Sequence, residues 1–185
     1  GQYSPTSPFG TKTTSTPDGS LDYPVQPLSI ALGAEATFVG RGVDMNPKHL
    51  IEMVRRMIDH KGTSFLEIYQ NCVIFNQGAF DYAEDRKIRA DHTIELEHGK
   101  PLVFGQNLDK GIIMHGRELK AVQLGENDFS KDDLLVHDEK GRIGYHSVLA
   151  RMKQPDLPEP IGVLRDVERP SYDDLVNNQI MQVRS

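Results

Sequence analysis

Cys72 is the only cysteine of the chain, and its position is the first sign of a site. It comes just after a predicted strand, Ser64–Tyr69, and in open α/β sheets ligands gather outside the carboxyl ends of the strands. A lone cysteine flanked by Val73, Ile74 and Phe75 is, however, most often a small buried hydrophobic residue. The residues alone leave both interpretations open. A single cysteine cannot form an internal disulfide, which agrees with a reducing compartment.

The histidines and the acidic residues do not form a recognisable metal-binding pattern. His137 and His146, with Asp138 and Glu139, come nearest to a ligand set, but zinc sites usually show more closely spaced ligand pairs. We therefore interpret this segment as a solvated loop. The wider acidic run lacks the glycine of a calcium-binding loop and is interpreted as a solvated face; it comprises Asp128, Asp132, Asp133, Asp138 and Glu139.

The common catalytic motifs do not occur in this sequence. It contains no Walker A loop, no G-x-S-x-G elbow, no H-E-x-x-H and no C-x-x-C. Gly40-Arg41-Gly42 follows a predicted strand, but the third glycine and the spacing of a dinucleotide-binding fingerprint are missing. We interpret these glycines as a turn at the end of the strand.

The elements that must position these residues begin with a long loop. Proline has no N–H to donate and restricts the residue before it, so a proline-rich segment makes neither a helix nor a good strand. Loops of this length are usually functional or disordered, so we expect a site loop or a severed chain end. The turn-forming residues within 1–27 are Pro5, Pro8, Gly10, Pro17, Gly19, Pro24 and Pro27.

The next segment has the pattern of a βαβ unit. A short helix starting at Pro27 should lead into a buried strand over Ala36–Arg41. Asn46 and Pro47 then predict the start of a helix that ends before Gly62, because apolar residues recur between them at helical spacing. With the strand Ser64–Tyr69 that follows, we expect a right-handed crossover between two parallel strands.

After Asn76 the pattern becomes β-rich and less regular. Thr93–Leu96 and Pro101–Phe104 are predicted as short strands around a turn at residues 98–100, and Gly111–Met114 should pair with Leu119–Val122. The remaining predictions are short helical or loop segments at Ser130–Leu135 and Tyr145–Met152, a strand at Ile161–Arg165 and a closing helix or tail at Tyr172–Gln182.

Composition limits the class of protein. The chain has 185 residues, of which 37% are hydrophobic and 26% charged, as in soluble globular proteins. Its net charge of -6 opposes binding to nucleic acids or to anionic membranes. There is no apolar run near the length of a membrane span and no secretory signal at the start. We therefore expect a soluble, cytoplasmic protein with no nucleic-acid or membrane partner.

Four collinear segments resemble one known family. The segments are residues 1–8, residues 32–41, residues 66–76 and residues 167–173. Together they are similar to the carboxyl-terminal half of the beta subunit of 2-oxoacid:ferredoxin oxidoreductases, specifically the 2-oxoglutarate type (2-oxoglutarate synthase).

The resemblance implies an α/β fold, namely part of a parallel-sheet thiamine diphosphate-binding fold with a β-rich carboxyl-terminal extension. Residues 1–77 would form the carboxyl-terminal half of the thiamine diphosphate-binding domain, and residues 78–185 the extension. The implied reaction is the oxidative decarboxylation of 2-oxoglutarate and CoA to succinyl-CoA. The implied cofactors are thiamine diphosphate, Mg²⁺ and a 4Fe-4S cluster, which passes single electrons to ferredoxin. An alpha subunit would complete the site.

The resemblance also assigns individual residues. Cys72 matches the position at which the family supplies its last ligand to the 4Fe-4S cluster, and thiolates are the usual ligands of such clusters. Gln2, Ser4 and Thr6 match the loop that follows the family's magnesium-binding motif, so we expect them at the edge of the thiamine and substrate site.

The sequence departs from the family pattern in what should precede Gly1. The family's other cysteines and its magnesium-binding motif are not in this chain. We therefore expect a partial subunit that is inactive alone and needs the amino-terminal half to bind its cofactors. Two alternatives stay open: a beta subunit that uses pyruvate or a branched-chain 2-oxoacid, and a non-catalytic α/β interaction module, because fold alone does not imply function.

Overall fold

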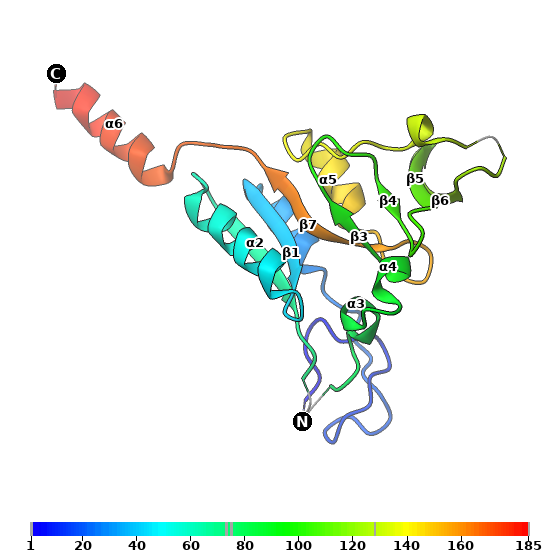
Figure 1. The fold of residues 1–185 in the computed structure, drawn as a ribbon. Coiled ribbons are helices and arrows are strands. Elements are labelled where there is room, and N and C mark those ends of the chain that lie inside the picture. Colours follow the sequence, from blue (N-terminus) through cyan, green and yellow to red (C-terminus); the bar gives the residue numbers. More distant parts are fainter. Residues whose placement is uncertain (1, 73, 75, 128, 185) are drawn as a thin grey trace.

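The computed structural model describes residues 2–72, 74, 76–127 and 129–184. Figure 1 shows a four-stranded mixed sheet with helix α2 on one side, a smaller three-stranded sheet beside it, and a long amino-terminal loop at one end. A helix at the carboxyl-terminal end points away from the rest of the molecule (Figure 1). No helix within the described residues is both long and apolar enough to cross a membrane.

The predicted βαβ unit is confirmed. Helix α1 (Pro27–Gly33) precedes strand β1 (Phe38–Val43), and helix α2 (Pro47–Asp59) joins β1 to strand β2 (Ser64–Tyr69). The two strands are parallel along their whole length. Proline at the first helical position starts both helices, as its fixed φ and missing donor favour.

Two later strands complete the main sheet, in the order β2-β1-β7-β3. Strand β7 (Glu159–Asp166) runs antiparallel to β1, and strand β3 (Thr93–Leu96) runs parallel to β7. The expected pairing of Thr93–Leu96 with Pro101–Phe104 is therefore wrong. The segment after the turn pairs with residues 135–137 instead, because Gly99 and Leu102 donate their N–H groups to His137 and Leu135.

The smaller sheet contains β4 (Val103–Phe104), β5 (Lys110–His115) and β6 (Glu118–Gln123), all antiparallel. The predicted hairpin of the last two strands is confirmed. The short helices are α3 (Asp81–Glu84), α4 (Arg89–His92), the 3₁₀ turn η1 (Lys131–Asp133) and α5 (Ile143–Leu149), and the last helix is α6 (Tyr172–Arg184).

Gly40 and Gly42 do not form the expected strand-end turn, since both lie inside β1. A Cβ atom on Gly40 would lie 2.5 Å from the terminal methyl of Met53 on α2, and one on Gly42 would lie 2.9 Å from Leu50. The glycines therefore allow helix α2 to pack closely on the strand.

One hydrophobic core extends across residue 77. Leu28 and Val39 pack in the same cluster as Ile94, Ile112 and Leu164. The proposed division into residues 1–77 and 78–185 remains a prediction, although the two parts share this core and the main sheet. Gly1, Val73, Phe75, Asp128 and Ser185 lie outside the described residues.

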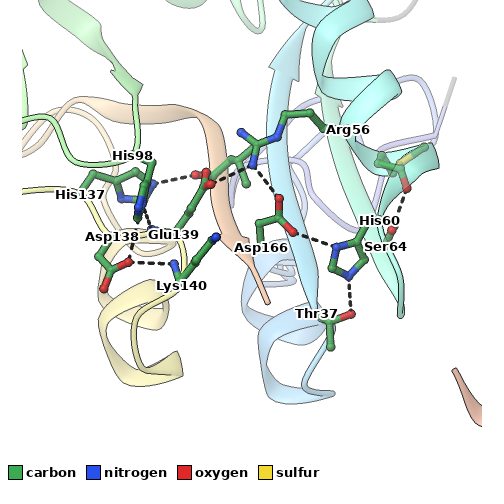
Figure 2. Close-up of polar contacts among 12 residues, drawn as sticks. Thr37, Arg56, His60, Ser64, His98, His137, Asp138, Glu139, Lys140 and Asp166 are labelled. Atoms are coloured by element: carbon green, nitrogen blue, oxygen red, sulfur yellow. Dashed lines mark hydrogen bonds and ion pairs between the residues drawn. The ribbon is translucent and has the colours of Figure 1, made fainter. Parts of the chain in front are cut away.

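A polar network ties the end of β7 to α2 and to the start of β1 (Figure 2). His60 contacts Thr37 through Nε2 at 2.8 Å and Asp166 through Nδ1 at 2.8 Å. Arg56 donates to Asp166 at 2.6 Å and to Glu139 at 3.0 Å. Thr37, His60 and Asp166 form a hydroxyl–imidazole–carboxylate chain of contacts, as in the triad of a hydrolase. The cavity described below, however, lies at the opposite end of β1. The network therefore serves to hold strand and helix together.

Candidate functional site

A cavity of about 810 Å³ lies at the carboxyl ends of the parallel strands β1 and β2. This is where open α/β sheets usually bind ligands, and the volume is within the usual range for small-molecule sites. Its lining comes from residues 2–27, here called the amino-terminal arm, from Arg41 on β1, from the end of β2 and described residues between it and Tyr82, from residues 150–154 and from Glu159. The residues assigned by the family resemblance all line this one cavity: Gln2, Ser4, Thr6 and Cys72.

Short side chain-to-backbone hydrogen bonds shape the amino-terminal arm. The Ser4 hydroxyl accepts the N–H of Thr6 at 3.0 Å and lies 2.7 Å from the Thr6 hydroxyl, and the Ser4 N–H donates to Ser7. Val25 donates its N–H to Pro5, which closes the arm on itself. Such local bonds are the usual alternative to helix or strand for Ser and Thr among prolines. The predicted loop is confirmed, and it forms a wall of the cavity.

Buried charges form one side of the cavity. Arg41 on β1 is 4% exposed and donates from Nε to Glu67 on β2 at 2.7 Å. Its guanidinium also lies 3.6 Å from Glu159 at the start of β7, and 4.8 Å from the ring centre of Tyr69. Burial alone would lower the pKa of Arg41, but Tyr69, Glu67 and Glu159 outweigh it and raise that pKa. The cation is therefore permanent.

Two tyrosines complete this charged side. The Tyr69 hydroxyl donates to Glu159, and burial is the main cause of a raised pKa for Tyr69. The pKa of Tyr82 is also raised, mainly by burial and then by Glu159. Both phenols therefore stay protonated, and Tyr69 acts as a donor to the Glu159 carboxylate. Phe80 stacks on Tyr69 with ring centres 4.2 Å apart, which joins the segment after Cys72 to this cluster.

Cys72 is exposed, so its interpretation as a buried hydrophobic residue is wrong. It follows β2 closely, as predicted, and its carbonyl accepts the N–H of Asn76 at 2.9 Å. Two of the flanking residues on which the buried interpretation rested, Val73 and Phe75, lie outside the described residues.

The histidine segment is not the solvated loop expected from the sequence. His137 and His146 are 1% and 0% exposed, and both ring nitrogens of each take part in hydrogen bonds. Glu139 is also buried: its carboxylate accepts a hydrogen bond from Arg56, and its backbone carbonyl accepts the N–H of Asp166 on β7. The other described acids of the run are exposed as expected: Asp132, Asp133 and Asp138. Asp128 lies outside the described residues.

Within the described residues, no group of three or more His, Cys, Asp or Glu side chains is arranged to hold a metal ion. Sequence reasoning also missed the cluster of Arg41, Glu67 and Glu159. A signal was present, since charged residues inside otherwise apolar strands are rarely fully buried unless they are paired.

Comparison with known proteins gives a consistent set of relatives. No model of a known protein family matches the chain. Subunit KorB of the 2-oxoglutarate oxidoreductase of Mycobacterium tuberculosis is 40% identical over 100% of this chain and 49% of its own length. The beta subunit of a 2-oxoacid:ferredoxin oxidoreductase of Saccharolobus solfataricus is 37% identical over 68% of this chain and 40% of its own length. The chain thus spans about half the length of the curated relatives it matches, or less.

A solved structure has the same fold. It is a 2-oxoglutarate:ferredoxin oxidoreductase from Magnetococcus marinus with 2-oxoglutarate, coenzyme A and succinyl-CoA bound. The superposition has a TM-score of 0.66 and covers 100% of this chain and 48% of that one, at 20% sequence identity. The mixed α/β fold with parallel strands predicted from the sequence is therefore confirmed.

Proposed function

The chain is a member of the family of 2-oxoacid:ferredoxin oxidoreductase beta subunits, whose carboxyl-terminal half it matches, and we propose that it works as part of a 2-oxoglutarate:ferredoxin oxidoreductase. The proposed reaction converts 2-oxoglutarate and CoA to succinyl-CoA and CO₂, with electrons passing through a 4Fe-4S cluster to ferredoxin. The observation that carries the proposal is the single cavity shared by Gln2, Ser4, Thr6 and Cys72.

Cys72 is suited to hold one corner of the iron-sulfur cluster. Its side chain is exposed and lines the cavity, so the sulfur is accessible to a metal without rearrangement of the core. Thiolates are the usual ligands of 4Fe-4S clusters, which transfer single electrons when bound. The sequence contains one cysteine. In the proposal the remaining ligands therefore come from the part of the longer subunit that this chain does not cover.

The amino-terminal arm is suited to border thiamine diphosphate. Ser4 and Thr6 both line the cavity, and their hydroxyl groups are hydrogen-bonded to each other at 2.7 Å. Thiamine diphosphate supplies carbanion stabilisation at the substrate carbon when bound. The protein's part is to orient this cofactor, and we assign that task to Gln2, Ser4 and Thr6. We assign the Mg²⁺ ligands to the part of the subunit outside this chain.

The buried ion cluster supports this assignment by giving the cavity a rigid side. Arg41, Glu67 and Glu159 join three neighbouring strands, so the end of the sheet cannot shift without separating buried charges. A preorganised wall is what a site needs if it is to hold reacting groups in one geometry.

We further propose the assembly that the family resemblance implied. An alpha subunit would complete the site, ferredoxin would accept the electrons, and the compartment would be the reducing cytoplasm. Residues 1–77 would complete the thiamine diphosphate-binding domain, and residues 78–185 would be an extension that packs on this domain or on the alpha subunit.

The test is a complete complex that carries Cys72→Ala. We expect its iron content to fall and its 2-oxoglutarate-dependent reduction of ferredoxin to drop by about tenfold or more, since lost cluster support typically costs that much. Gln77→Ala is the matched control, because Gln77 is exposed, lies in the same segment and is not part of the cavity lining. Undiminished iron and rate in Cys72→Ala would remove Cys72 from the cluster.

The same complex tests the substrate. Reduction of ferredoxin is measured with 2-oxoglutarate, pyruvate and a branched-chain 2-oxoacid in turn. We expect the highest kcat/KM with 2-oxoglutarate, since the chain is 40% identical to a 2-oxoglutarate oxidoreductase subunit. A higher kcat/KM with pyruvate would leave the proposed cofactors in place but replace 2-oxoglutarate as the proposed substrate. No reduction of ferredoxin with any of the three 2-oxoacids would contradict the enzyme assignment.

A further inference from the structure

Asn71 lies between strand β2 and Cys72, and it makes three hydrogen bonds to the region of helix α3. Its side-chain amide donates from Nδ2 to Asp81 Oδ1 at 2.9 Å, and its Oδ1 accepts the N–H of Phe80 at 2.8 Å. Its backbone N–H donates to Glu84 Oε1 at 3.1 Å. The residue directly before Cys72 is therefore fastened through both its backbone and its side chain.

The groups that hold Asn71 are themselves part of a rigid structure. Phe80 stacks on Tyr69 of β2, and the Tyr69 hydroxyl is bonded to the buried carboxylate of Glu159. The anchor of Asn71 is thus connected to the charged side of the cavity. Fixing Asn71 relative to this cluster fixes the starting point and direction of the chain that carries the thiol.

The bonding pattern requires an amide. One end of the side chain must accept from a backbone N–H while the other end donates to a carboxylate, and only Asn offers both at this length. An aspartate at position 71 would keep the acceptor for Phe80 but would place a second carboxylate against Asp81. The same pattern would be restored if the partner at position 81 became the donor.

We propose that Asn71 is a positioning residue for Cys72: it holds the thiol toward the cavity in the geometry that cluster binding needs. The inference rests on the proposed function of Cys72 as a cluster ligand. It goes beyond that function because it assigns a role to the amide of Asn71 and to its partner Asp81, through which the protein controls the place of the sulfur.

The variants follow from the bonding pattern. Asn71→Asp should release the segment because two carboxylates then face each other, whereas Asp81→Asn alone keeps an oxygen acceptor for Asn71. The double variant N71D/D81N reverses donor and acceptor and should restore the contact. Gln77→Ala again serves as the matched control on an exposed position of the same segment.

The first measurement is the rate at which a bulky disulfide reagent modifies Cys72 in the 185-residue chain, where it is the only thiol. The added carboxylate beside Cys72 disfavours the reactive thiolate, so the rates are compared per thiolate, from their measured pH dependence. On that scale we expect N71D to react about fivefold faster with the bulky reagent because the released segment can move away from the cavity wall, and about fivefold is the change that loss of a hydrogen bond typically produces. D81N, Q77A and the double variant should stay within about twofold of the native rate. A native rate in folded N71D, or a double variant as fast as N71D, would overturn the proposal. If circular dichroism shows N71D to be unfolded, Asn71→Ala replaces it, because it removes the side-chain bonds without adding a charge.

The second measurement uses the complete complex and reads the iron content and the midpoint potential of the cluster. N71D should lower the iron content or shift the potential, and the double variant should return both to the native values. If Cys72→Ala leaves iron and potential unchanged, the proposed function of Cys72 fails, while the modification rates still decide the role of Asn71. Unchanged iron and potential in N71D, in a complex that loses its cluster with Cys72→Ala, would overturn the positioning role alone.

Discussion

Arg41 on β1 and Glu67 on β2 form a 2.7 Å hydrogen-bonded ion pair across adjacent parallel strands, directly beside the cavity. The side chains are 5% and 15% exposed, so water screens the pair only weakly. Arg41 and Glu67 are paired directly opposite each other in the β1–β2 register, so the ion pair links the two strands that carry the site.

Removing the cation should therefore be strongly destabilising. Arg41→Met keeps much of the packing volume but leaves Glu67 and Glu159 without their counter-charge, and breaking a buried pair in this way typically costs about 3–5 kcal/mol. The free energy of unfolding is measured by urea denaturation at neutral pH. The triple variant Arg41→Met with Glu67→Gln and Glu159→Gln should recover much of the loss, since no buried charge then remains in this cluster.

The exposed ion pair of Arg169 with Glu35 is the matched control. Its side chains are 49% and 61% exposed, and surface pairs contribute little because water and salt screen them. Arg169→Met should therefore change the free energy of unfolding far less than Arg41→Met. Equal losses at the two sites would contradict the view that burial makes the Arg41 cluster important.

Gly40 should not tolerate a side chain while Met53 occupies the neighbouring space. In Gly40→Ala the new Cβ would lie 2.5 Å from the Met53 methyl and 3.2 Å from the Gly162 carbonyl oxygen, and overpacking of this kind costs about 1–3 kcal/mol. Met53→Ala alone is destabilising because it leaves a cavity. The double variant should lose less than the sum of the two single changes, and urea denaturation of all three proteins measures this coupling.

Gly33 provides the control, because nothing lies within 4 Å of a Cβ built on it. Gly33→Ala should be neutral or slightly stabilising at the end of α1, where alanine favours the helix. Strict additivity between Gly40→Ala and Met53→Ala would show that the methyl of Met53 is not the group that requires a glycine.

Local patterns predicted the elements that the chain forms from neighbouring residues. Pro47 and the apolar spacing after it marked helix α2, and Ser64–Tyr69 is a strand at those same residues. The turn at residues 116–117 joins the predicted hairpin of β5 and β6. The helix and the hairpin are defined by interactions within one short stretch of chain, whereas β2 was recognised from its own residues although its partner β1 lies on the other side of helix α2.

Contacts between distant segments were not predictable in this way. Strand β7 lies between β1 and β3, but its sequence does not indicate with which strands it pairs. The glycines of β1 were interpreted as a turn because the close approach of Met53 to Gly40 is known only from the three-dimensional structure. The position of Cys72 directly after a strand indicated that it lies near a site. Gln2, Ser4 and Thr6 were assigned only through the family resemblance, because the amino-terminal arm reaches the same cavity as Cys72 only through the folding of the chain.

The two buried histidines predict a loss of stability at mildly acidic pH. Burial is the main cause that lowers the pKa of His137 and His146 in the folded chain. His146 shows the physical reason: its Nε2 bonds to the Asp138 carbonyl, while its Nδ1 lies 3.3 Å from the donor Arg165, so a proton on Nδ1 would face a cation. His137 likewise lies between the Val163 carbonyl and the Tyr145 hydroxyl.

The sign follows from the direction of these shifts. The unfolded chain takes up protons near the ordinary histidine pKa of about 6.5, whereas the folded chain resists protonation until the pH is lower. Stability should therefore be constant above about pH 7 and fall as the pH decreases below about 6.5, with a slope of up to two protons. Tm measured from pH 5 to pH 8 checks this. His146→Gln can keep a donor for Asp138 and an acceptor for Arg165 without a titrating group, so its slope should be smaller by one proton. The exposed His115 is the control, and if His115→Gln flattened the profile as much as His146→Gln, the buried histidines would not be the cause.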